Sequence, residues 1–169
     1  MSKDFIYCQR DIPKEKWRYG FRSSAATGCG WIATYNALLL LGKRIAPEKL
    51  IRFYERQLPF IHGNTGTAIL APAIFFKRHG YDVKCTVIRS HFDAMVEASD
   101  VCILYFWWCR KWAAGAHFVA LHQTEEGIVG YNTYNNSKGP DYYGESLEAF
   151  LKKKKYFGAV LIGISKIRK

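Results

Sequence analysis

Residues 27–42 read TGCGWIATYNALLLLG, and the rest of the chain is interpreted outward from them. From Gly30 to Leu41 nearly every residue is apolar, which predicts a central helix buried on most of its sides. Gly42 marks its end, because glycine easily takes the left-handed conformation that closes a helix. Cys29 falls in the first turn, where free N–H groups and the positive end of the helix dipole lower the pKa of a thiol. Cys29 is therefore a candidate nucleophile, and an inert buried thiol is the alternative.

The residues before and after Gly80 differ in character. Before it, helices are expected over 47–58, whose apolar residues form one stripe, and over 67–79, where Pro72 indicates a kink or a start near Ala71. After it, β-branched and apolar runs predict strands over 81–89, 100–109, 116–123, 127–133 and 159–167. Short helices are expected over 90–99 and 145–155, and a polar loop over 135–144. Helices followed by strands favour an α+β domain, in which the helix that carries Cys29 packs on a mostly antiparallel sheet.

The chain has 169 residues, of which 49% are hydrophobic, so it has the size and the apolar content of one folded domain. This composition excludes a disordered chain. No internal repeat and no Pro/Gly/Ser-rich linker divides the sequence. We expect a single domain over residues 1–169, with residues 1–22 as an N-terminal extension that packs on it.

Charge and cysteine content limit the partners and the location. Lys and Arg number 25 against 14 Asp and Glu, a formal net charge of +11 that favours acidic partners. No nucleic-acid-binding motif is present, so nucleic acid is not an expected partner. The five cysteines include no C-x-x-C pair, so neither a metal site nor a full disulfide framework is expected. The apolar runs are shorter than the about 20 residues that span a bilayer, and the N-terminus does not read as a signal peptide, so a cytoplasmic location is the expectation.

A histidine and an asparagine stand where they can act on Cys29. His117 opens a strand directly after a Gly-Ala turn, where its side chain can face outward and pair with the thiol. Asn132 ends the next strand, and a hairpin brings the two positions together. The Asn132 amide oxygen would then accept a hydrogen bond from one ring nitrogen and leave the other facing the thiol. A structural imidazole and an ordinary loop asparagine are the alternatives.

The order Cys, His, Asn, with the cysteine opening a long central helix, resembles papain-like cysteine peptidases, and most closely their bacteriocin-processing, double-glycine peptidase branch. The resemblance covers most of the chain from about Ser23, in the stretches TGCGWIATYNALLLLG, GNTGTAILAPAIFFKRHGYDV, AHFVALHQTEEGIVGYNTY and SLEAFLKKKKYFGAVLIGI. It implies a papain-like fold with Cys29 as nucleophile, His117 as general base and Asn132 as third member. It also implies that Tyr134 shields the Asn–His bond.

One departure from the family concerns the oxyanion hole. The family usually places a glutamine several residues before the cysteine as a side-chain donor, and here that stretch reads FRSSAATG. The backbone N–H of Cys29 remains available, and Gln9, Ser23, Ser24 and Thr27 are the candidates for the second donor. Gln9 is favoured among them because only it carries an amide N–H₂.

The sequence therefore favours a cysteine peptidase or amide hydrolase that acts on a peptide or protein substrate through a thioester acyl-enzyme, with no metal or organic cofactor. Trp108 and Trp112, just before His117, are expected to line a substrate groove. An acyltransferase of transglutaminase or peptide-ligase type is an alternative on the same triad. A catalytically inactive papain-like module that binds peptides is the alternative from another class.

Overall fold

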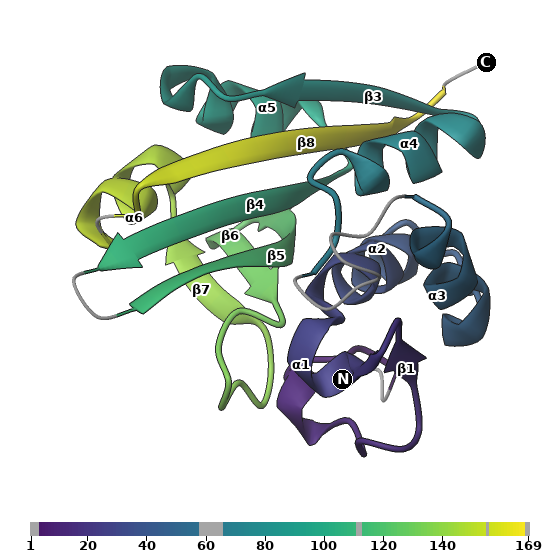
Figure 1. The fold of residues 1–169 in the computed structure, drawn as a ribbon. Coiled ribbons are helices and arrows are strands. Elements are labelled where there is room, and N and C mark those ends of the chain that lie inside the picture. Colours follow the sequence, from purple (N-terminus) through teal and green to yellow (C-terminus); the bar gives the residue numbers. More distant parts are fainter. Residues whose placement is uncertain (1–3, 58–65, 111–112, 155, 168–169) are drawn as a thin grey trace.

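The computed structural model describes residues 4–57, 66–110, 113–154 and 156–167 (Figure 1). Its α-helices are α1 (Ser24–Thr27), α2 (Cys29–Leu40), α3 (Pro47–Glu55), α4 (Ala71–Arg78), α5 (Phe92–Ala98) and α6 (Leu147–Lys154). Its strands are β1 (Arg18–Tyr19), β2 (Arg22–Ser23), β3 (Tyr81–Thr86), β4 (Val101–Arg110), β5 (Ala113–Thr124), β6 (Gly127–Tyr131), β7 (Asp141–Gly144) and β8 (Gly158–Lys166). Short 3₁₀ helices lie at η1 (Gln9–Asp11) and η2 (Arg89–His91).

The second half of the chain builds one six-stranded antiparallel sheet in the order β3-β8-β4-β5-β6-β7, as the mostly antiparallel α+β expectation requires. The C-terminal strand β8 lies between β3 and β4, where both faces of the sheet are covered. Burial on both faces explains why β4 and β8 are continuous apolar runs and do not alternate. Ile103 and Leu104, which face opposite ways along β4, are both fully buried.

Helix α2 packs on one face of this sheet, and α5 and α6 cover the opposite face (Figure 1). Trp31, Ile32 and Ala37 of α2 share a core with Phe118 and Ala120 of β5. A second core on the other face contains side chains of α5, α6 and the sheet. The prediction of a central helix buried on most sides is confirmed, because Trp31, Ile32, Ala33 and Ala37 are all fully buried.

Some element boundaries differ from the sequence predictions, and one expected start is confirmed. Of the two alternatives for the helix over 67–79, the start near Ala71 is the one observed: α4 begins at Ala71 and has Pro72 in its first turn. Proline lacks an N–H and disfavours helical conformation in the residue before it, so the helix starts there. The expected helix over 47–58 ends at Glu55, and residue 58 lies outside the described residues. The expected polar loop over 135–144 contains β7, whose four residues are too few for an alternating pattern to be recognised.

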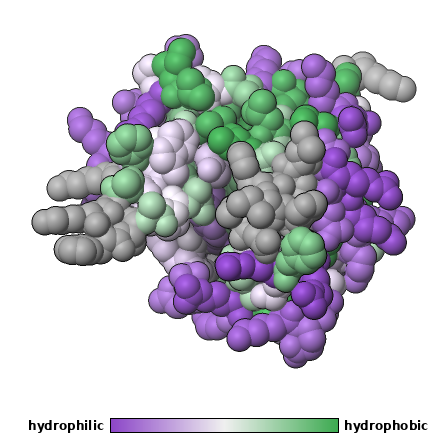
Figure 2. Space-filling model, viewed as in Figure 1, coloured by the Kyte–Doolittle hydropathy of each residue, from purple (hydrophilic) through white to green (hydrophobic). Residues whose placement is uncertain are grey.

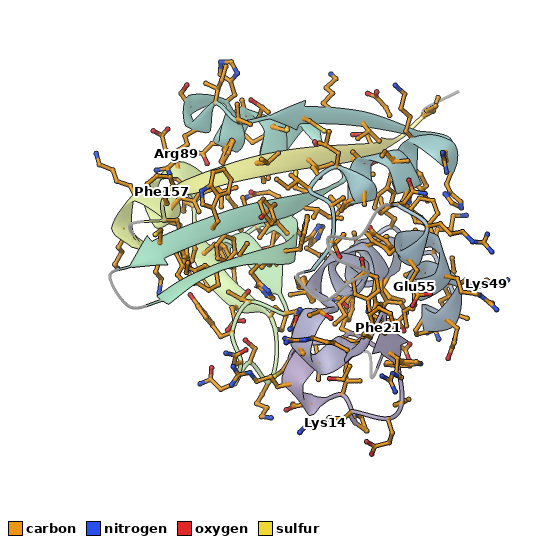
Figure 3. The ribbon with its side chains drawn as sticks, viewed as in Figure 1. Lys14, Phe21, Lys49, Glu55, Arg89 and Phe157 are labelled. Atoms are coloured by element: carbon orange, nitrogen blue, oxygen red, sulfur yellow. The ribbon has the colours of Figure 1, made fainter. Side chains whose placement is uncertain are left out.

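The described part of the N-terminal extension is fastened to the helices. Asn36, fully buried in the apolar α2, accepts a hydrogen bond from the Ile6 N–H at 3.0 Å and donates one to the Ile6 carbonyl at 2.8 Å. Figure 3 shows Phe21 beside Glu55 of α3, and the Gly20 N–H donates to Glu55 Oε1 at 3.0 Å. These contacts hold residues 4–22 against the side of the molecule where α2 begins.

The surface is mostly hydrophilic in the lower part of the view in Figure 2, and apolar side chains gather in its upper part, around β3 and β8. Exposed apolar residues of that region include Val87 and Ile88, which follow β3. Among the helices that the structure describes, none has the length and apolar content to cross a membrane.

Candidate active site

Cys29 begins α2 at a tight junction with α1. Gly28 joins the two helices, and a Cβ atom there would lie 2.6 Å from both the Ser24 carbonyl oxygen and Trp31 Nε1. Gly30 is equally crowded, because a Cβ atom would lie 2.6 Å from the Cβ atom of Thr67. The two glycines let α1 and Thr67 approach the first turn of α2 closely. They fix the position of Cys29, which remains partly exposed.

The Cys29 sulfur lies against β5 at Phe118. Burial raises the pKa of the Cys29 thiol, and hydrogen bonds from the backbone N–H groups of Phe118, Gly30 and Cys29 lower it only in part. The contact with Phe118 is possible because β6 pairs with β5 only as far as Ala120, which leaves this edge of β5 open. Cys29, the predicted nucleophile, therefore lies next to Phe118, which directly follows the predicted base His117 in the sequence.

The His117 ring is held by the main chain at Asn132. His117 Nε2 lies 2.5 Å from the Asn132 carbonyl oxygen. A carbonyl can only accept, so Nε2 carries the proton and Nδ1 is the basic nitrogen. Burial lowers the pKa of His117, and the bond to Asn132 raises it only in part. These directions favour a neutral imidazole and a neutral thiol, and among the described contacts no hydrogen bond joins Cys29 to His117.

Asn132 meets His117 as the hairpin predicted, but through a different atom. Its side-chain amide, expected to accept from His117, bonds to Gln9 instead: Oδ1 accepts from the Gln9 N–H at 2.8 Å, and Nδ2 donates to Gln9 Oε1 at 3.3 Å. Asn132 has φ 65°, the only positive φ among the described residues other than glycine. Asparagine adopts this left-handed conformation more readily than most residues. The conformation directs the carbonyl and the side chain to different partners.

Three of the candidate oxyanion donors lie in different surroundings. Gln9 Nε2 donates to the Ala25 carbonyl at 3.1 Å, which leaves its second hydrogen available. Ser23 is half-buried and lines a pocket of about 520 Å³ together with Gln9 and Asn135. Ser24 is fully buried, and its Oγ accepts a hydrogen bond from Trp31 Nε1 at 3.1 Å, so it does not face a groove.

A second pocket, of about 270 Å³, opens beside His117 and is lined mostly by aromatic rings. Besides His117, its lining residues are Phe106, Trp108, Thr133, Tyr134, Asn135 and Tyr156. Trp108 and Tyr134 were expected near the site, and Trp112 lies outside the described residues. Sequence reasoning missed Phe106 and Tyr156. The strand register provides a signal for Phe106, which lies directly opposite His117 on β4.

The electrostatics of the two pockets differ. Among the residues that line the aromatic pocket there is no Asp or Glu, and Lys154 Nζ lies 5.3 Å from the centre of the Tyr134 ring. The larger pocket is lined by Arg10 and Lys14, and by no acidic residue. Within the described part of the chain, no group of three or more His, Cys, Asp or Glu side chains is placed to hold a metal ion.

Comparison with solved structures identifies the fold. The chain is similar to the peptidase domain of Streptococcus ComA, a bifunctional ABC transporter involved in a quorum-sensing pathway, with a TM-score of 0.55. The match covers 83% of this chain and 93% of that domain at 11% sequence identity, so it shows the fold alone. The predicted papain-like peptidase fold is thereby confirmed. No protein-family model and no curated protein matches the sequence.

Proposed function

We propose that this chain is a cysteine hydrolase that cleaves amide bonds in peptides or proteins, with Cys29, His117 and Asn132 as its triad. The observation that carries the proposal is the 2.5 Å bond between His117 Nε2 and the Asn132 carbonyl, in a strand whose next residue, Phe118, contacts the partly exposed Cys29 through its main-chain N–H. This bond orients the ring and leaves Nδ1 as the base. The likeness in fold to a peptidase domain supports the proposal.

In the proposed acylation, Nδ1 of His117 accepts the thiol proton as the Cys29 sulfur bonds to the substrate carbonyl carbon. The carbonyl oxygen becomes an oxyanion, stabilised by the Cys29 N–H at the start of α2. The C–N bond then breaks, and His117 gives the proton to the leaving amine. Water attacks the resulting thioester and loses a proton to Nδ1, and the thiol leaves as the carboxylic acid forms.

The two pockets suggest the substrate class. Because His117 protonates the leaving amine, the pocket beside it is suited to the first side chain of the leaving group. Its four aromatic rings favour an apolar or aromatic side chain over a lysine or arginine, especially with Lys154 near Tyr134. Arg10 and Lys14 in the larger pocket favour acidic residues elsewhere in the peptide.

Two alternatives use the same site. Acyl transfer follows the same steps with an amine in place of water in the second half. A binding module without turnover is favoured by one observation: the Cys29 thiol is kept neutral by burial and, among the described contacts, does not hydrogen bond to His117.

A mixture of internally quenched peptides with acidic and aromatic residues tests the proposal. Cleavage is expected from the unmodified chain and from Cys85→Ala, the matched control at an exposed thiol. It is expected to fall on the order of 10⁴-fold in Cys29→Ala and His117→Ala. Transfer of the acyl group to an added amine, in preference to water, would support the transferase. Peptide binding that persists in Cys29→Ala without any turnover by the unmodified chain would support the binding module.

A further inference from the structure

We propose that Gln9 is a positioning residue that holds the two halves of the candidate site in register. The inference rests on the proposed function and assigns Gln9 a role different from oxyanion donor. One half of the site is the α1–α2 junction that carries Cys29. The other half is the end of β6, where Asn132 orients His117. Gln9, in η1, bonds to both halves.

The first tie is to Asn132. Gln9 uses its main-chain N–H and its Oε1 to bond both polar atoms of the Asn132 carboxamide, at 2.8 and 3.3 Å. Asn132 is only 2% exposed, so water does not readily replace these bonds. A carboxamide held at both ends cannot rotate, and the residue that carries it is held at φ 65°. The Asn132 carbonyl is thereby kept on His117 Nε2.

The second contact of Gln9 is with the half of the site that carries Cys29, the α1–α2 junction. Gln9 Nε2 donates to the carbonyl of Ala25 in α1, four residues before Cys29. The Gln9 side chain thus joins α1 to Asn132, which lies 123 positions after Gln9 in the sequence. Neighbouring contacts follow the same path: Cys8 Sγ donates to the Asn135 carbonyl at 3.1 Å, and Lys138 Nζ pairs with Asp11 at 2.9 Å. The segment around Gln9 therefore lies between the two halves of the site and joins them.

Alkylation by iodoacetamide separates positioning from oxyanion stabilisation. In this reaction the Cys29 sulfur bonds to the methylene carbon, iodide leaves, and the thiol proton passes through His117 Nδ1 to water. No carbonyl oxygen develops charge, so an oxyanion donor has no effect on the rate. A residue that positions His117 does affect it, because the base must accept the thiol proton.

The test variant is Gln9→Met, which keeps the length of the side chain and the main-chain N–H but loses both side-chain bonds. Cys29 alkylation is followed by peptide mass spectrometry between pH 4 and pH 10, the interval that contains the ordinary pKa values of about 6.5 for histidine and 8.5 for cysteine. The rate on the pH-independent plateau is expected to fall on the order of tenfold, as the loss of two hydrogen bonds near the site allows. The acid limb is expected to move to lower pH, because a weakened bond to Asn132 no longer raises the pKa of His117.

Two thiols and one further variant act as controls. Exposed Cys109 is expected to react at an unchanged rate, and buried Cys102 reports any global unfolding. Gln123→Met, at an exposed glutamine in β5, is the matched substitution and is expected to leave Cys29 unchanged. If Gln9→Met exposes Cys102, Gln9→Glu is used, which keeps the acceptor for Asn132 and is expected to retain the plateau more fully than Gln9→Ala.

The proposal is overturned if Gln9→Met leaves the plateau and acid limb of Cys29 unchanged while His117→Ala abolishes the plateau. A loss of peptide cleavage without a change in alkylation also overturns it, in favour of an oxyanion donor. Failure of the proposed function is a separate result, in which His117→Ala itself has no effect on Cys29.

Discussion

Asn132 performs two tasks with two different groups of atoms. Its carbonyl oxygen holds the His117 ring, and its carboxamide bonds to Gln9. The division depends on the left-handed backbone, which asparagine and glycine tolerate and most other residues do not. The backbone conformation at this position is therefore as important to the site as the side chain.

Asn132→Gly is expected to keep more Cys29 reactivity than Asn132→Ala. Glycine retains the carbonyl and adopts φ 65° without strain, whereas alanine in this region costs about 1 to 2 kcal/mol. The rate of Cys29 alkylation measures the reactivity that each variant keeps, and the free energy of unfolding in urea measures the strain in the alanine variant. Equal loss in the two variants would instead assign the orienting role to the carboxamide.

At the scale of elements, the site depends on how α2 meets its neighbours. Thr67 fills the space beside Gly30, and its hydroxyl donates to the Tyr19 hydroxyl at 3.2 Å. The first turn of α2 is thus packed on one side by Thr67. Any side chain at position 30 must displace Thr67 or move Cys29.

Gly30→Ala is expected to destabilise the fold by about 1 to 3 kcal/mol, the range for overpacking a filled core. Urea denaturation measures this directly. Gly30→Ala combined with Thr67→Gly removes the clashing side chain and is expected to recover part of the loss. A stable Gly30→Ala single variant would contradict the packing described for this turn.

Elements with a long or regular pattern were predictable from sequence. The apolar run after Cys29 and the turn between β5 and β6 were recognised because each contains its own signal, and the β5–β6 hairpin brings His117 to Asn132. The tie between Gln9 and Asn132 was not predictable, because it joins residues 123 positions apart without a pattern. The choice of carbonyl over carboxamide depends on one backbone angle, which residue type alone does not determine.

For the whole molecule, Cys29 and His117, both partly buried, link stability to pH. Burial lowers the pKa of His117, so below about pH 6.5 the unfolded chain takes up a proton that the folded chain resists. The contribution of neutral His117 to stability is fully present above this pH and is lost as the pH falls through the pKa of His117 in the folded chain. Burial raises the pKa of Cys29, so its contribution is lost as the pH rises above about 8.5, the unfolded value.

His117→Gln is expected to reduce the loss of stability between about pH 7.5 and pH 5, because glutamine does not titrate there. Unfolding in urea at both pH values gives the change in the free energy of unfolding between them for each protein. His91→Gln, at an exposed histidine, is the control and is expected to follow the unmodified chain. Identical pH dependence in all three proteins would contradict the buried, neutral state of His117.

The net charge of +11 acts over the whole surface and most directly at the larger pocket. Lys14→Glu is expected to raise KM for acidic peptides with little change in kcat, because Lys14 attracts the substrate and lines a pocket whose described lining residues include neither Cys29 nor His117. The difference is expected to shrink near 1 M salt, where the Debye length is about 3 Å. Steady-state kinetics at low and high salt check it, and a fall in kcat alone would contradict this role.

The central claim is that His117 activates Cys29, and the pH dependence of Cys29 alkylation in the unmodified chain and in His117→Ala tests it most directly. A plateau at neutral pH is expected in the unmodified chain, with an acid limb below the ordinary histidine pKa of about 6.5. In His117→Ala the plateau disappears and only alkaline ionisation of the thiol remains, while exposed Cys109 reacts alike in both proteins. A Cys29 profile that is the same in both proteins, with an alkaline limb only, would contradict the claim.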